Sequence, residues 1–207
     1  GQGPVIESAD IESLYKKLDS LKAGDMVVLA GSIPATLPLA EPESFYSDIM
    51  ARLCKRGIGF TVDATRDLLK KALPYKPFLI KPNNLELGEL FGVTIERREA
   101  LIPYAVKLRE MGAQNVLASI AEKGAVLAAA DGNVYQGDAP SGVPVNAVGS
   151  GDSMTAGFIA GYLRTRDYAE SLKLGLCAET ASACSDNLAD RALIEQFLAQ
   201  SPDVSRM

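Results

Sequence analysis

The chain has 207 residues, a formal net charge of −5 and no histidine. Hydrophobic residues make up 47% and charged residues 23%, a balance typical of folded proteins, which excludes a largely disordered chain. The acidic charge gives no electrostatic basis for nucleic-acid binding, and the absence of His excludes imidazole bases and His-ligated metals. The length predicts one domain over residues 1–207.

The three cysteines, Cys54, Cys177 and Cys184, are widely spaced and contain no C-x-x-C pair. This pattern argues against a disulfide framework or a zinc site and is compatible with a reducing compartment. No apolar run approaches the roughly 18 residues that a membrane span needs, and no signal peptide opens the chain. The sequence therefore predicts a cytoplasmic protein without membrane association.

Short apolar runs alternate with helical periods along most of the chain. In chain order we expect a helix at 8–21, a strand buried on both faces at 26–30, a helix at 42–56, strands at 59–62 and 78–81, helices at 84–91 and 97–111, strands at 116–120 and 125–130, a hairpin strand at 134–135, and helices at 152–164, 167–185 and 189–199.

Alternating strands and helices predict βαβ units, and therefore an α/β fold with a parallel sheet covered by helices on both faces. Ligands of such sheets bind at the carboxyl ends of the strands. The segments to consider are those that directly follow a strand, namely 31–34, 63–65, 81–86, 119–124 and the loop that ends at Asp152.

The sequence Gly149-Ser150-Gly151-Asp152 precedes a long helical pattern. Two glycines around a serine allow several backbone N–H groups to point at one spot, and the following helix adds its positive dipole end. This arrangement predicts an anion site with the carboxylate of Asp152 at its rim. The alternative is an ordinary turn with an acidic first-turn residue that stabilises the helix.

Two other phosphate-binding loops are excluded. No Gly-x-x-x-x-Gly-Lys-Ser/Thr sequence occurs, which excludes a P-loop. Met154 occupies the third glycine position of a dinucleotide fingerprint that would begin at Gly149, and the motif lies late in the chain, which argues against a Rossmann dehydrogenase.

Three further segments each allow two interpretations. Asn83 and Glu86 lie three apart on the first turn of a helix, where they could help hold Mg²⁺ near phosphates or form a helix cap. The stretch 119–124 is either a ligand loop or a plain hairpin connection, and 31–34 is either a ligand loop or a strand terminator.

Together, in this order, these segments resemble the PfkB (ribokinase-like) carbohydrate kinase family. Residues 149–152 are similar to the end of the family's second signature, D-T-x-G-A-G-D, and supporting stretches lie at 28–34, 78–86, 145–157 and 184–188. The likeness covers the whole chain and corresponds to the C-terminal two-thirds of a family member. It implies a three-layer α/β/α ribokinase-like fold with a mostly parallel central sheet, with the N-terminal part and its β-lid missing.

The resemblance also implies roles for individual residues. Asp152 would be the catalytic base, and the N–H groups of Gly149, Ser150 and Gly151 would form the anion hole. Asn83 and Glu86 would position the metal, and Gly31, Ser32 and Asp63 would face the acceptor sugar. The residues implied to contact the nucleotide, besides Asn83, are Lys81, Ser119, Glu122, Gly124, Ser185 and Asn187.

The implied activity is transfer of phosphate from ATP, with Mg²⁺, to fructose 1-phosphate, giving fructose 1,6-bisphosphate and ADP. Tagatose 6-phosphate is the alternative acceptor, and a non-catalytic ATP-binding module is the alternative function. The whole protein is expected to form a homodimer through the missing lid, and the 207-residue chain alone is expected to have little activity. Ala121 departs from the family pattern, because relatives usually have Gly there.

Overall fold

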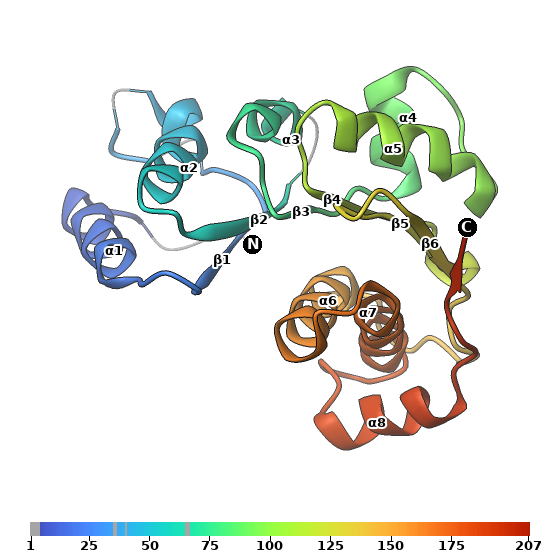
Figure 1. Cartoon of the computed structure of the whole chain (residues 1–207). Coiled ribbons are helices and arrows are strands. Elements are labelled where there is room, and N and C mark those ends of the chain that lie inside the picture. Colours follow the sequence, from blue (N-terminus) through green and yellow to red (C-terminus); the bar gives the residue numbers. More distant parts are fainter. Residues whose placement is uncertain (1–4, 35–36, 40, 65–66) are drawn as a thin grey trace.

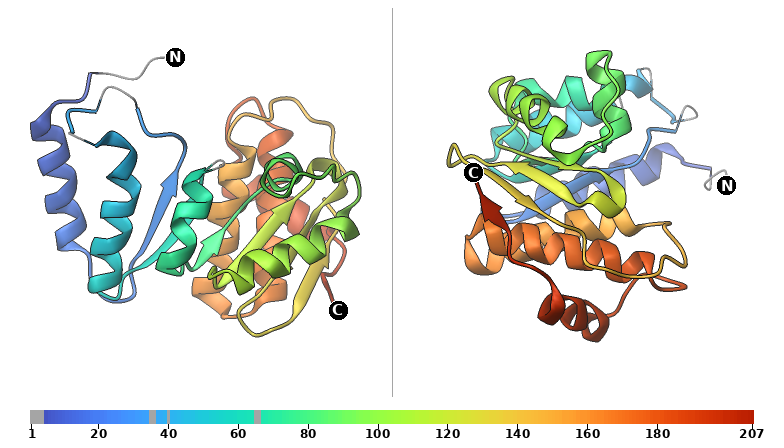
Figure 2. Two further views of the ribbon diagram at one scale, coloured as in Figure 1. Left: turned by 90° about the horizontal axis from the view of Figure 1, so that it is seen from above. Right: turned by 90° about the vertical axis from the view of Figure 1, so that its right-hand side faces the viewer.

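The computed structural model describes residues 5–34, 37–39, 41–64 and 67–207. The chain folds into three layers, with one mixed sheet between two layers of helices (Figures 1 and 2). The strands lie in sequence order across the sheet. They are β1 (Met26–Ala30), β2 (Gly59–Asp63), β3 (Leu79–Ile80), β4 (Asn115–Ser119), β5 (Ala125–Ala128), β6 (Val134–Gly137) and β7 (Ser205–Arg206). The pairs from β1 to β4 are parallel and those from β4 to β7 are antiparallel.

The helices lie on both faces of this sheet, as the alternating pattern predicts (Figure 1). Helices α2 to α5 lie over one face, whereas α6 and α7 lie against the other face, with α8 outside them. They are α1 (Ser8–Ser20), α2 (Phe45–Lys55), α3 (Asp67–Ala72), α4 (Asn84–Phe91), α5 (Ile102–Glu110), α6 (Ser150–Thr165), α7 (Tyr168–Ala183) and α8 (Arg191–Gln200). The predicted α/β/α layering is confirmed, whereas the sheet, expected to be mostly parallel, is mixed, with three parallel and three antiparallel pairs of described strands.

Each face of the sheet has its own hydrophobic core, because successive strand residues point to opposite faces. In β3, Leu79 packs with Phe158 and Leu172 of α6 and α7, whereas Ile80 packs into the core on the opposite face. Val116 and Leu117 divide in the same way in β4. The near-continuous apolar runs that predicted these strands therefore reflect burial on both sides.

The prediction that residues 26–30 are buried on both faces is wrong. Val28 of β1 is 46% exposed and Ala30 is exposed, whereas Leu29 is buried. Strand β1 pairs with β2 alone among the described strands, and Figure 1 shows α6 and α7 beneath β3 to β6 but not beneath β1. The apolar sequence of a strand does not show which of its two faces is covered by other parts of the chain.

The remaining differences from the predicted elements concern short segments. The expected helices at 42–56 and 97–111 each begin with a 3-10 turn, at Pro42–Ser44 and Arg98–Leu101. Helix α3 and strand β7 were not predicted, because six residues and two residues are too short to establish a period.

Candidate functional site

The carboxyl ends of the four parallel strands lie side by side because the strands are in register. Ala30 pairs with Asp63, and Val62 pairs with Ile80. The N–H of Gly31 donates to the carbonyl of Asp63 (3.1 Å), and a β-bridge links Asn83 to Ser119. The post-strand residues that the sequence singled out therefore follow one edge of the sheet.

Helix α6 begins at this edge with the geometry of an anion site. Gly149 has φ +80° and ψ 0°, and a Cβ there would lie 2.8 Å from the Cδ2 of Leu188, so the backbone and the space both favour glycine. The N–H of Ser150 donates to the carbonyl of Ala147 (3.2 Å). Within the described part of the chain, the N–H groups of Gly149, Gly151 and Asp152 have no acceptor. They are the donors that an anion at this helix end can use.

A buried ion pair lies directly beneath this helix end. The Nζ of Lys81 is 3.4 Å from Oδ1 of Asp63, and a Cβ on Gly151 would lie 3.2 Å from the same Nζ. Thr155, one turn into α6, donates from Oγ1 to Oδ2 of Asp63 (2.8 Å). Lys81 therefore brings a positive charge to the backbone of the anion site, and Asp63 and Thr155 hold it there.

The pKa of Asp63 is raised because its carboxyl is buried, and the nearby Lys81 ammonium and the Thr155 hydrogen bond oppose this shift. The charge of Asp152 adds to the increase. Asp152 itself is exposed, and among the described residues its carboxylate has no hydrogen bond or ion pair. An exposed carboxylate beside an anion site is available to accept a proton from an incoming hydroxyl.

The Asn83–Glu86 pair forms a helix cap. The Oδ1 of Asn83 accepts from the N–H groups of Leu85 and Glu86 (both 2.9 Å), and Oε2 of Glu86 accepts from the N–H of Asn83 (2.9 Å). Burial raises the pKa of the Glu86 carboxyl, and the hydrogen bond from Asn83 opposes that shift.

The Asn83–Glu86 pair therefore forms the helix cap, which was one of its two interpretations. The cap still leaves carboxylate oxygen available to a metal. No described group of three or more His, Cys, Asp or Glu side chains could hold a metal ion. A Mg²⁺ ion takes most of its ligands from water and phosphates and needs only one or two carboxylates. The Glu86 carboxylate fits that limited part, because its one hydrogen bond to a described residue uses Oε2.

The loop between β4 and β5, the loop before α6 and the end of α7 line a cavity of about 210 Å³ that reaches Ser150. Of the predicted nucleotide residues, Glu122 lines it, whereas Ser185 and Asn187 lie outside its lining. Ser119, at the end of β4, is buried, and Gly124 has φ +83°, where a Cβ would collide with the carbonyl oxygen of Gly137. Glu179 also lines this cavity, and no local sequence pattern distinguishes it from its neighbours.

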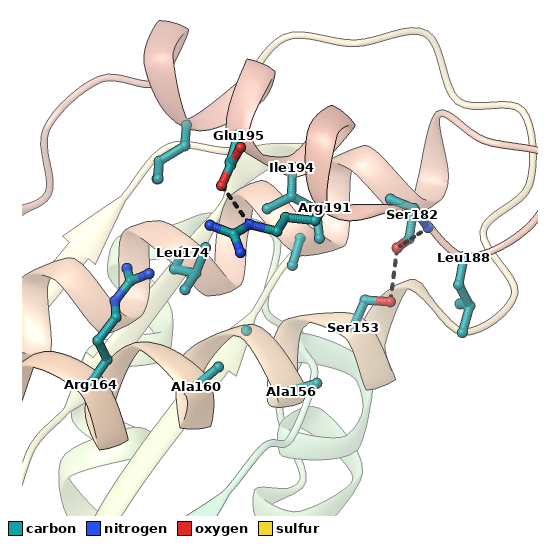
Figure 3. Close-up of a pocket in the computed structure, with 14 residues that line it drawn as sticks. Ser153, Ala156, Ala160, Arg164, Leu174, Ser182, Leu188, Arg191, Ile194 and Glu195 are labelled. Carbon is teal, nitrogen blue, oxygen red and sulfur yellow. Dashed lines mark hydrogen bonds and ion pairs between the residues drawn. The ribbon is translucent and has the colours of Figure 1, made fainter.

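A second, larger hollow of about 530 Å³ lies between α6, α7 and α8 (Figure 3). Leu174 and Ile194 line it, and the Arg191–Glu195 ion pair (2.7 Å) crosses its wall. None of the predicted site residues lines it. At one end, Ser182 donates to Ser153 (2.8 Å), and Ser153 donates to the carbonyl of Gly149 (3.0 Å), so this hollow ends behind the anion site.

Ala121 adopts a left-handed backbone, with φ +42°, at an exposed position in the loop from 119 to 124. A side chain with a Cβ costs about 1 kcal/mol or more in this region. Replacing Ala121 by Gly is therefore expected to raise the free energy of unfolding by up to about 1 kcal/mol. Ala147→Gly, at an exposed position without positive φ, should lower the free energy of unfolding. Urea denaturation measures both variants, and an equal change in the two would contradict this explanation.

Comparison with known proteins agrees with this geometry. Residues 3–187 match the pfkB family carbohydrate kinase profile, and the chain belongs to that family.

The chain is 40% identical over 200 residues to the 1-phosphofructokinase of Bacillus subtilis, covering 97% of this chain and 64% of that one. It is 26% identical to the D-tagatose-1-phosphate kinase of Bacillus licheniformis, covering 96% and 64%. The crystal structure of a Staphylococcus aureus protein proposed to be a phosphofructokinase has a TM-score of 0.88 and 32% identity, covering 100% of this chain and 66% of that one. The chain thus spans slightly less than two thirds of the length of these relatives.

The described helices include none with both the length and the apolar character that crossing a bilayer requires.

Proposed function

We propose that residues 1–207 form the single nucleotide-binding domain of a cytoplasmic, ATP-dependent phosphosugar kinase. The proposed reaction converts fructose 1-phosphate and ATP into fructose 1,6-bisphosphate and ADP. The observation that carries this proposal is the start of α6, in a chain of the PfkB family. There the Lys81 ammonium and the Asp152 carboxylate meet N–H groups that have no acceptor among the described residues.

In this mechanism, Asp152 accepts the proton of the sugar hydroxyl as that oxygen attacks the γ-phosphate of ATP. The N–H groups at the start of α6 and the Lys81 ammonium stabilise negative charge on the transferring phosphoryl group. Mg²⁺, when bound with the nucleotide, neutralises phosphate charge, and Glu86 with Asn83 would orient it. Gly31, Ser32 and Asp63 lie at the same strand edge on the side proposed for the sugar.

The choice of acceptor rests on the relatives, whose names give fructose and tagatose phosphates. The tagatose relative is named for the 1-phosphate, whereas the sequence suggested the 6-phosphate as the alternative acceptor. The part of the family fold that this chain does not span would contribute to the acceptor site and to a homodimer. A non-catalytic ATP-binding module is the second candidate. The Asp152 carboxylate, which has no partner among the described residues, disfavours it, because a carboxylate beside phosphates weakens nucleotide binding and is useful only for catalysis.

The test is release of ADP by two proteins, this chain alone and this chain fused to the third of the Bacillus subtilis relative that it does not match. Each is assayed with fructose 1-phosphate, tagatose 1-phosphate and tagatose 6-phosphate. We expect little turnover by the chain alone and turnover of fructose 1-phosphate by the fusion. Nucleotide binding without turnover in the fusion would favour the non-catalytic module.

A further inference from the structure

Glu179 is an acidic residue of α7 that the mechanism above does not use. It lines the cavity of about 210 Å³ together with Ser150, the first residue of α6. Within the described residues, its carboxyl has no hydrogen bond or ion pair. The rest of the cavity lining is mostly small or apolar, and it is formed by Ala121, Glu122, Ala139, Pro140, Gly142, Pro144, Ala147, Thr180, Ala183 and Cys184.

The charges around Glu179 are unbalanced. Lys81 is the cation whose charge acts on it, and the same ammonium also acts on Asp63 and Glu86. Glu122 shares the cavity from the β4–β5 loop, and Asp152 stands in the first turn of α6. The thiol of Cys184 is the other titratable group in the cavity lining. Among the described residues, the Lys81 ammonium therefore acts on three carboxyl groups.

Burial raises the pKa of Glu179 to about 7, and the charge of Lys81 opposes this shift. The carboxyl therefore loses its proton much closer to neutral pH than an exposed glutamate does. A polyphosphate bound at the start of α6 would bring several negative charges to the same cavity, and nearby like charges disfavour ionisation further.

We propose that Glu179 is a nucleotide-contacting residue whose carboxyl takes up a proton from solvent when the nucleotide binds. The neutral carboxyl can donate a hydrogen bond to a phosphate or ribose oxygen, whereas the carboxylate repels the phosphates. This inference rests on the proposed nucleotide site.

The experiment is calorimetric titration of the 207-residue chain with MgADP between pH 6.5 and pH 8.5, in two buffers that differ in ionisation enthalpy. The buffer difference reports the protons taken up and needs no variant. We expect uptake approaching one proton near pH 8, and an affinity that falls about tenfold from pH 7 to pH 8.5, because each pH unit above the free pKa costs up to a factor of ten.

Two variants locate the proton. Glu179→Gln carries a neutral group of the same size, and it should bind MgADP with an affinity that is independent of pH and without proton uptake. Glu170→Gln removes an exposed carboxylate from the first turn of the same helix and should keep the behaviour of the unmodified chain.

Binding without proton uptake, or a pH dependence that persists in Glu179→Gln, would overturn the inference and leave the nucleotide site intact. Failure of MgADP to bind at every pH would overturn the inference together with the proposed site.

Discussion

Asp152→Asn is expected to lower the turnover of fructose 1-phosphate by the fused protein by about 10² to 10⁴-fold, the usual contribution of a general base. Asparagine keeps the size of the side chain in the first turn of α6 and cannot accept the proton of the sugar hydroxyl. Affinity for MgATP should be kept or increased, because the variant removes a negative charge beside the phosphates. The measurement is kcat together with calorimetric affinity for the nucleotide.

Asp48→Asn, an exposed change on α2, is the matched control and should leave turnover unchanged. Turnover by Asp152→Asn within a factor of about three of the unmodified enzyme would show that the base is a different group. A parallel loss of nucleotide binding would indicate that Asp152 supports the anion site and does not act in proton transfer.

Lys81→Met is expected to lower the free energy of unfolding by about 3 kcal/mol at pH 7.5, because it leaves a buried carboxylate without its cation. Lys81 and Asp63 have side chains that are 9% and 15% exposed, so water screens the pair weakly. Without Lys81 the raised pKa of Asp63 rises further. The folded state then binds a proton more tightly than the unfolded chain, so the variant loses stability as the pH rises and should be less impaired at pH 5.

Urea denaturation at the two pH values checks this prediction. The double variant Asp63→Asn with Lys81→Met also removes the carboxylate that pairs with Lys81, and it should recover most of the lost stability at pH 7.5. An equal loss at pH 5 and pH 7.5, or no recovery in the double variant, would show that the Lys81 stem and not its charge is what stabilises this edge of the sheet.

The sequence predicts the layers and the site edge well, because their signals are local. Apolar runs such as that at β4 identify strands, and glycines followed by a helical period locate the start of α6. The residues that follow parallel strands meet at one edge for topological reasons alone.

Contacts between distant segments are not encoded in any local pattern. The Lys81–Asp63–Thr155 network joins three separate elements, and neither its cation nor its hydroxyl carries a motif that indicates the partner. No local pattern distinguishes Glu179 from other polar residues of a helix, since only the packing of α7 against the loops places this half-buried residue at a cavity. Exposure of β1 was missed for the same reason, because the covering layer lies elsewhere in the chain.

The Asn83–Glu86 pair shows a different limit of prediction from sequence. A cap and a metal-positioning pair use the same residues at the same spacing, and the structure contains the cap. The two roles are compatible, because the cap fixes the orientation of the carboxylate that would face Mg²⁺.

The central claim is that the start of α6 binds the phosphates of a nucleotide. Calorimetric titration of the unmodified chain and of Ser150→Asp with MgATP tests this claim most directly. An acidic residue in the first turn favours the helix dipole, so this variant should fold at least as stably as the parent while its charge repels phosphates. We predict one MgATP site in the unmodified chain and its loss in Ser150→Asp, with the free energy of unfolding kept or raised. No binding by the unmodified chain, or binding that Ser150→Asp leaves unchanged, would contradict the account.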